Sequence, residues 1–232
     1  MSIFNEAFLS YSEMSKINPR VTQVPPTPRV NQLAKVTEIL DRHFSFETIN
    51  VIETGGSHNW DDGMVGYYFA YLANKTNGKF TSVDIDPNLY QPVVNAYKTA
   101  DPTFEITHIT DDSLNLLKNP PYIPNLVHLD SWDVNLKDPL PSALHGWREF
   151  EAIESQMPPG SIIIIDDNWY EGAYTHWYTV DNDTKQLLTE ERIDITWPAI
   201  GKGAHIFQWA LPPNTHWNIL DAGYKLIIQK QW

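Results

Sequence analysis

Residues 161–169 combine an apolar strand with the side chains best suited to chemistry. Four consecutive isoleucines at 162–165 predict a strand buried on both faces, as in a parallel sheet covered by helices. Asp166, Asp167 and Asn168 follow directly. Ligands of open α/β sheets bind outside the carboxyl ends of the strands, and oxygen-rich side chains there suit a hard cation such as Mg²⁺. A strand-end turn is the alternative, because Asp and Asn are common turn residues.

Polar residues also follow the other predicted strands. Glu53 ends the first strand, and Gly55 and Gly56 would let the backbone turn sharply and approach a ligand, although an ordinary turn would use them equally well. Asp84 ends the second strand, at the usual position of a carboxylate that binds ribose hydroxyls. Asp130 ends the fourth strand and would lie near Asp167 if the fourth and fifth strands are neighbours.

The third predicted strand is followed by Asp112 and Ser113. A carboxylate at this place could accept a hydrogen bond from the exocyclic amine of adenine. Either residue could instead cap the helix that follows, and the two roles are compatible. Both interpretations stay open at this point.

The elements that must position these residues alternate along the chain. The predicted strands are 50–54, 79–85, 104–110, 126–130 and 161–166. The predicted helices are 30–44, 64–74, 87–100, 113–118 and 143–156. Strand-like pieces follow at 177–180 and 187–195, with two final strands at 205–211 and 224–229. Strands that alternate with helices indicate βαβ units and a mostly parallel sheet. We expect an N-terminal arm, 1–30, and a single α/β domain, 31–232.

Composition limits the class of function. With net charge −13 and only 16 Lys and Arg spread along the chain, nucleic acid is not an expected partner. The absence of cysteine excludes disulfides and thiolate metal sites. No apolar run approaches the roughly 18 residues of a membrane span, and the first residues do not resemble a signal peptide. We therefore expect a cytoplasmic protein without a membrane partner.

Taken together, these residues resemble those of the class I S-adenosylmethionine-dependent methyltransferases. The resemblance covers about residues 45–170 and is closest to the metal-assisted, small-molecule group of the catechol O-methyltransferase kind. It implies an α/β fold with a doubly wound, Rossmann-like, mostly parallel seven-stranded sheet and an antiparallel C-terminal hairpin. The cofactor residues that it implies are Glu53, Gly55, Gly56, Ser57, Asp84, Asp112 and Ser113. The implied ligands of Mg²⁺ or Mn²⁺ are Asp130, Asp167 and Asn168.

The implied reaction is methyl transfer from S-adenosylmethionine to a hydroxyl of a small molecule, assisted by a divalent metal. Where catechol enzymes carry a lysine base, this sequence has Asp133, so Asp130 and Asp133 are the candidate catalytic residues. This departure leaves two alternatives open. One is a metal-free methyltransferase that acts on a sugar or an amine, and the other is an inactive nucleotide-binding protein of the same fold. The proline-rich arm also suggests a homo-oligomer.

Overall fold

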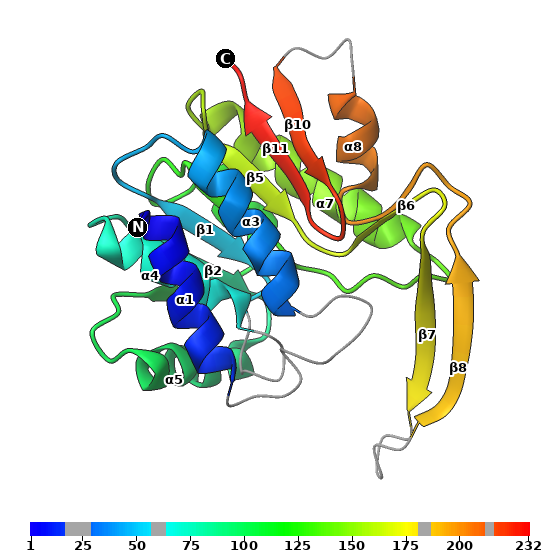
Figure 1. The fold of residues 1–232 in the computed structure, drawn as a ribbon, viewed down its shortest axis with the longest axis horizontal. Helices are drawn as coiled ribbons and strands as arrows, with labels where there is room; N and C mark the ends of the chain where they lie inside the picture. Colours follow the sequence, from blue (N-terminus) through cyan, green and yellow to red (C-terminus); the bar gives the residue numbers. More distant parts are fainter. Residues whose placement is uncertain (17–28, 57–63, 181–186, 212–215) are drawn as a thin grey trace.

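A seven-stranded sheet forms the centre of the protein, for which a computed structural model describes all residues except 17–28, 57–63, 181–186 and 212–215 (Figure 1). The strand order is β10-β11-β5-β4-β1-β2-β3. The strands are β1 (Val51–Thr54), β2 (Phe80–Asp84), β3 (Thr107–Thr110), β4 (Leu126–Leu129), β5 (Ile162–Ile165), β10 (Trp217–Ala222) and β11 (Leu226–Lys230). Strands β1 to β5 pair in parallel, whereas β11 lies antiparallel to both β5 and β10. The predicted fold class is confirmed.

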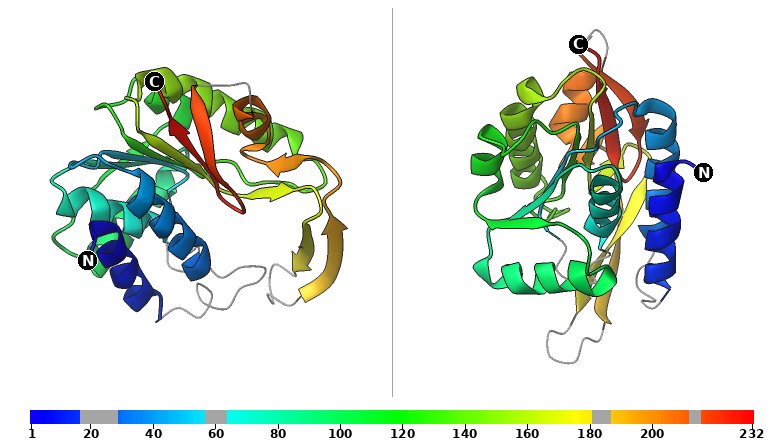
Figure 2. Two further views of the ribbon diagram at one scale, coloured as in Figure 1. Left: turned by 45° about the horizontal axis from the view of Figure 1, so that its top comes forward. Right: turned by 90° about the vertical axis from the view of Figure 1, so that its left-hand side faces the viewer.

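Helices cover both faces of this sheet, as Figure 2 shows. One face packs against α1 (Ile3–Ser15), α3 (Arg29–His43), α4 (Val65–Lys75) and α5 (Tyr90–Ala100). The other face packs against α6 (Ser113–Lys118), α7 (Leu140–Ile153) and α8 (Ala204–Ala210). Two short 3₁₀ helices, η2 (Pro87–Leu89) and η3 (Glu154–Gln156), adjoin α5 and α7.

The isoleucines of β5 show why this strand has no polar face. Ile162 and Ile164 pack with the first group of helices, and Ile163 and Ile165 with the second. All four are fully buried. Because successive side chains of a strand point to opposite faces, a strand covered by helices on both sides needs an unbroken apolar run.

The prediction of a strand at 205–211 is wrong, because this segment forms helix α8. Its buried residues Ile206 and Ala210 are four positions apart, which places them on one face of a helix. The first strand of the C-terminal hairpin is instead β10, and Trp217 packs from it against Phe150 of α7. A short apolar segment does not by itself distinguish a strand from a helix.

Helix α1 anchors the first residues of the chain. Ser2 caps it by accepting a hydrogen bond from the backbone of Asn5, and its buried face contains Phe4, Ala7 and Tyr11. The helix packs against α3 and α4. Among the described residues, no helix combines the length and the apolar character needed to cross a membrane.

Four more strands lie between β5 and α8 in the described part of the chain. Strands β6 (Asn168–Tyr170) and β9 (Ala199–Gly201) form one small antiparallel pair, and β7 (Tyr174–Val180) and β8 (Leu187–Asp194) form another. The β7–β8 pair projects from the body as a long ribbon (Figure 1). The β6–β9 pair stays close to the sheet edge, where it positions residues that follow β5 and β9.

Candidate active site

The carboxyl ends of β1 and β4 meet where the strand order of the sheet reverses, which is where open α/β sheets bind ligands. The backbone N–H of Asp130 donates to the carbonyl of Thr54 at 3.1 Å. Gly55 follows with φ +71°, and a Cβ atom there would lie 2.4 Å from the carbonyl oxygen of Asp130. Only glycine therefore allows this turn to approach the end of β4 so closely.

A buried lysine joins the carboxylates that follow β4 and β5. Because these strands are parallel neighbours, Asp130 and Asp167 lie at the same edge, as predicted. The Lys202 ammonium lies 2.5 Å from Asp130 Oδ1 and 3.0 Å from Asp167 Oδ2, and it also donates to the Asp130 carbonyl at 3.0 Å. The side chain of Lys202 is only 2% exposed. Burial alone would lower the pKa of Lys202, but Asp130 and Asp167 outweigh burial and hold that pKa well above its ordinary value.

The β6–β9 pair explains why Lys202 reaches this position. Asn168 at the start of β6 faces Gly201 at the end of β9, and Lys202 is the next residue. Gly201 has φ +116°, and a Cβ atom there would lie 1.9 Å from the carbonyl oxygen of Asp167. The backbones of Gly201 and Asp167 therefore pack so closely that only glycine fits at position 201, directly before Lys202.

Asn168 has a structural role in this arrangement. Its amide nitrogen donates to the carbonyls of Ile165 and Asp166 at 2.8 and 3.0 Å. Its side-chain oxygen accepts from the backbone N–H of Gly203 at 2.7 Å. The Asn168 side chain thus joins the end of β5 to the residue after Lys202, and its oxygen already accepts a hydrogen bond.

Asp166 is the centre of a second buried group of charges, next to the group formed by Lys202, Asp130 and Asp167. Its Oδ2 lies 2.7 Å from Lys225 Nζ and 3.0 Å from Arg29 Nη1, and the carboxylate is fully buried. Burial alone would raise the pKa of Asp166, but Lys225 and Arg29 outweigh burial and hold it well below the ordinary value. Tyr224 connects the clusters by donating its hydroxyl to Asp167 Oδ1.

The depressed pKa of Asp166 predicts a loss of stability in acid. A carboxyl group whose folded-state pKa is lowered stabilises the fold fully above its unfolded pKa, about 3.9, and progressively less as the pH falls toward the folded value. We therefore expect the free energy of unfolding to fall below about pH 4, and less steeply in Asp166→Asn. Urea unfolding across this range measures both slopes, and equal slopes would contradict the assignment.

His128 links the Asp166 cluster to Glu53. Lys225 lies 3.4 Å from His128 Nε2, and since an ammonium only donates, this nitrogen accepts. His128 Nδ1 therefore carries the proton and donates to Glu53 Oε1 at 3.2 Å, while Tyr97 donates to Glu53 Oε2 at 3.1 Å. Burial lowers the pKa of His128, and the positive charge of Lys225 lowers it further. His128 is therefore a fully buried core residue with both ring nitrogens hydrogen-bonded.

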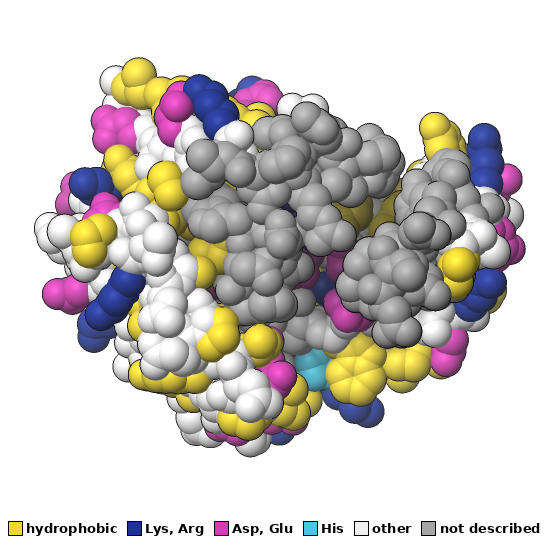
Figure 3. Space-filling model, turned by 90° about the horizontal axis from the view of Figure 1, so that it is seen from below, with side chains coloured by type: hydrophobic (Ala, Val, Ile, Leu, Met, Phe, Trp, Pro, Cys, Tyr) yellow, Lys and Arg dark blue, Asp and Glu magenta, His cyan; other side chains and the backbone are white. Residues whose placement is uncertain are grey.

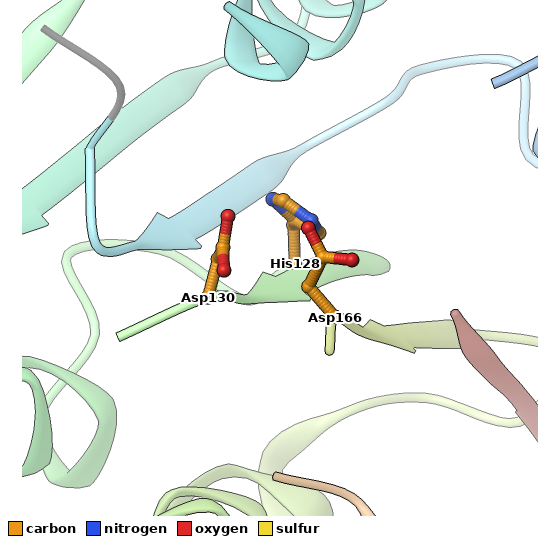
Figure 4. A group of neighbouring side chains, drawn as sticks. All are labelled: His128, Asp130 and Asp166. Carbon is orange, nitrogen blue, oxygen red and sulfur yellow. The ribbon is translucent and has the colours of Figure 1, made fainter. Parts of the chain in front are cut away.

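Two groups of side chains at this edge have types that bind metals. His128, Asp130 and Asp166 offer ligand atoms within 4.8 Å of one another (Figure 4), and Asp130, Asp167 and Asn168 are the predicted set. Neither group fits a divalent cation as the structure has it. Both ring nitrogens of His128 and the side-chain oxygen of Asn168 already take part in hydrogen bonds. Arg29, Lys202 and Lys225 already form ion pairs with the aspartates of both groups. Figure 3 shows the molecule from this edge, with acidic and basic side chains visible in the hollow between the body and the β7–β8 ribbon.

Comparison with known proteins identifies the fold. No family model and no curated protein matches the sequence. An S-adenosylmethionine-dependent methyltransferase from Clostridium acetobutylicum superposes with a TM-score of 0.54 at 12% identity, covering 96% of this chain and 99% of that one. The chain has the class I methyltransferase fold. A Staphylococcus aureus protein, provisionally assigned as a caffeoyl-CoA O-methyltransferase, agrees with a TM-score of 0.53 at 13% identity over 97% of this chain and 92% of its own.

The predicted cofactor residues lie along the carboxyl ends of β1, β2 and β3. Asp84 is partly exposed at the end of β2, where its Oδ1 accepts from the backbone N–H of Asp86 at 2.9 Å. Gly56 approaches two buried side chains, since a Cβ atom there would lie 2.4 Å from Ser82 Oγ and 3.3 Å from His108 Cε1. Among the described residues, neither Ser82 Oγ nor the nitrogens of His108 have a hydrogen-bond partner. Ser57 lies outside the described residues.

The structure supports the helix-capping interpretation of the segment after β3, and the adenine-binding interpretation stays a prediction. Asp112 caps α6 by accepting from the backbone N–H of Leu114 at 2.8 Å, so its structural role is confirmed. Ser113 is buried and lies 3.3 Å from His145 Nε2. His145 Nε2 lies 3.5 Å from Oε1 of Glu149, one helical turn away, and Glu149 is buried. Asp133 is exposed in the loop between β4 and α7.

Sequence reasoning missed the three cations of the site, Arg29, Lys202 and Lys225. Each lies far from its aspartate in sequence, so no local motif pairs them. Only Lys202 has a local signal, because a glycine precedes it and another follows it. Such a position suits close backbone packing around a functional side chain.

Proposed function

We propose that this protein transfers a methyl group from S-adenosylmethionine to a hydroxyl of a small molecule. The observation that carries the proposal is the cluster of charged side chains at the ends of β4 and β5, beside the strand-order reversal of a methyltransferase fold. The cofactor supplies an electrophilic methyl on a sulfonium and leaves as S-adenosylhomocysteine. The protein mainly needs to orient the acceptor and accept its proton.

Backbone strain around the same edge supports a functional site. Four described residues other than glycine have positive φ, and three of them are Met64, Trp132 and Asp167. Met64 begins the helix that follows β1, and the other two lie just beyond β4 and β5. Strained conformations of this kind cluster at ligand sites, where surrounding structure holds them. Trp132 also exposes 58% of its surface while it stacks on His145, so its indole is accessible to a planar ligand.

Asp130 is the residue we assign to the acceptor. Lys202 holds one of its carboxylate oxygens, Oδ1, whereas Oδ2 receives no hydrogen bond from the described part of the chain. Its side chain is 21% exposed, so this oxygen is accessible to a ligand. A carboxylate fixed in this way can accept the proton of an acceptor hydroxyl.

The nature of the acceptor follows from charge. The net charge of −13 would repel a nucleic acid over most of the surface, so a neutral or cationic small molecule is the proposed acceptor. An amine in place of a hydroxyl is the second candidate, because an ammonium also pairs with a free carboxylate and becomes nucleophilic once it has given a proton to that carboxylate. The metal assistance implied by the sequence resemblance is not part of the proposal, because Lys202 and Asn168 leave no fitting site.

Cofactor binding provides a test that needs no acceptor. We expect Asp84→Ala to weaken S-adenosylmethionine binding by about 1–3 kcal/mol, because ribose hydroxyls would lose their partner. Calorimetry on the folded variant measures the change. Asp86→Ala is the matched control, since Asp86 lies two residues away and caps η2 by accepting from Asn88.

The control should bind like the wild type. Equal affinity of wild type and Asp84→Ala would remove Asp84 from the cofactor site. Absence of binding by the wild type would refute the proposed function.

A further inference from the structure

We propose that the Lys202 ammonium takes the place of a metal ion between Asp130 and Asp167, so that the site needs no divalent cation. The role of this site in methyl transfer rests on the proposed function, whereas the metal-binding test described below does not. It assigns a positioning role to a residue of the β9–α8 segment that lies 72 positions from Asp130 in the sequence.

The ammonium is fully coordinated. Its three N–H groups have three acceptors: Asp130 Oδ1 at 2.5 Å, the Asp130 carbonyl at 3.0 Å and Asp167 Oδ2 at 3.0 Å. A bound Mg²⁺ usually keeps several water positions that a substrate can enter. The ammonium has no such open position, so it can orient Asp130 and Asp167 but cannot chelate an acceptor.

The charge balance of the cluster disfavours an additional cation. With all three aspartates ionised, Asp130, Asp166 and Asp167 balance the three positive charges of Arg29, Lys202 and Lys225, in ion pairs of 2.5–3.0 Å. Burial raises the pKa of Asp130 to about 7, and protonation of Asp130 would leave the cluster with a net positive charge. A divalent ion would add two positive charges to a balanced cluster and would have to displace an ammonium that is 2% exposed. Two carboxylates this close need a cation, and the chain supplies it.

The backbone holds Lys202 in place from three sides. Gly201 packs against the Asp167 carbonyl, and Gly203 donates to Asn168. Gly146 of α7 lies against Lys202 itself, because a Cβ atom at Gly146 would be 2.2 Å from the Lys202 carbonyl oxygen. The lysine is therefore built into the site and is not a surface side chain that folds inward.

The class of acceptor follows from this arrangement. A metal centre favours acceptors with two adjacent oxygens that can chelate. Here the available group is the second carboxylate oxygen of Asp130, which accepts hydrogen bonds but cannot chelate two oxygens of an acceptor. We therefore infer an acceptor that presents one hydroxyl or one amine, which gives its proton to Asp130, with no need for a chelating pair.

Manganese binding tests the proposal without any activity assay. The wild-type protein, titrated with Mn²⁺ and followed by electron paramagnetic resonance, should show no site with a dissociation constant below about 0.1 mM. Lys202→Met removes the charge at similar size and should create one site, at least about tenfold tighter than any in the wild type. Lys225→Met, which removes the other buried lysine, should not create one, and Lys202→Met with Asp167→Asn should lose it.

Two results would overturn the proposal. One is a stoichiometric Mn²⁺ site in the wild type that Asp167→Asn removes, and the other is a folded Lys202→Met variant that binds no better than wild type. Circular dichroism checks folding, and if Lys202→Met does not fold, the wild-type titration decides. Failure of S-adenosylmethionine binding would affect the proposed function alone, because Mn²⁺ is measured without the cofactor.

Discussion

Replacing Asp166 by asparagine should lower the free energy of unfolding by about 3–5 kcal/mol, the usual cost of leaving buried charges without a partner. Asp166 is fully buried and pairs with Lys225 and Arg29, whose side chains are 3% and 28% exposed. An asparagine fits the space but leaves both cations uncompensated. Urea unfolding at neutral pH, compared with the wild type, measures the loss.

A surface pair provides the control for this prediction. Glu38→Gln breaks the exposed contact with Arg42, and we expect it to cost less than about 1 kcal/mol. In a double-mutant cycle with Lys225→Met, the losses in the free energy of unfolding should not add. Each single variant leaves the charge of the other residue without its partner, whereas the double variant removes both charges. Additive losses, or an Asp166→Asn variant as stable as Glu38→Gln, would contradict the buried cluster.

The second large effect concerns the reaction. Asp130→Asn should lower kcat by about a hundredfold to ten-thousandfold, because an amide cannot accept the proton of the acceptor. S-adenosylmethionine affinity should change little, since Asp130 faces the acceptor side in our proposal. Rates with a hydroxyl-bearing acceptor and calorimetry with the cofactor separate these two effects.

Asp133→Asn is the comparison for this variant. Asp133 lies three residues away, was the second catalytic candidate from the sequence, and is exposed. We expect its replacement to lower kcat by less than about tenfold, since an exposed carboxylate contributes little electrostatic stabilisation. An Asp130→Asn variant that keeps more than a tenth of the wild-type rate would rule out Asp130 as the proton acceptor.

The strands and the acidic residues at their ends could be predicted from sequence because their signals are local. The isoleucine run of β5 and its acidic end occupy seven consecutive positions, 162–168. The approach of Asp130 to Asp167 needed one further assumption, that β4 and β5 are neighbours, and their pairing confirms it. Parallel strands place their carboxyl ends together whatever the intervening residues are.

The cations of the site were not predictable in the same way. Lys202 reaches Asp130 only because β9 pairs with β6, and that pairing depends on backbone contacts at Gly201 and Asn168 that leave no periodic pattern. The wrong prediction of a strand at 205–211 also obscured the position of Lys202, because a strand there would place this lysine away from Asp130. The sequence therefore predicted a metal site from carboxylates alone, because Arg29, Lys202 and Lys225, which pair with them, lie far away in the sequence.

The close contact between Gly55 and the Asp130 carbonyl also determines how the site can move. The Thr54 carbonyl accepts a hydrogen bond from the Asp130 N–H, so the turn after β1 and the end of β4 form one rigid unit. Under the proposed function, this contact holds the turn beside the methyl donor against the end of β4, which carries the carboxylate beside the acceptor. The distance between the methyl donor and its acceptor would then be set by the hydrogen bond and the close backbone contact between two neighbouring strands.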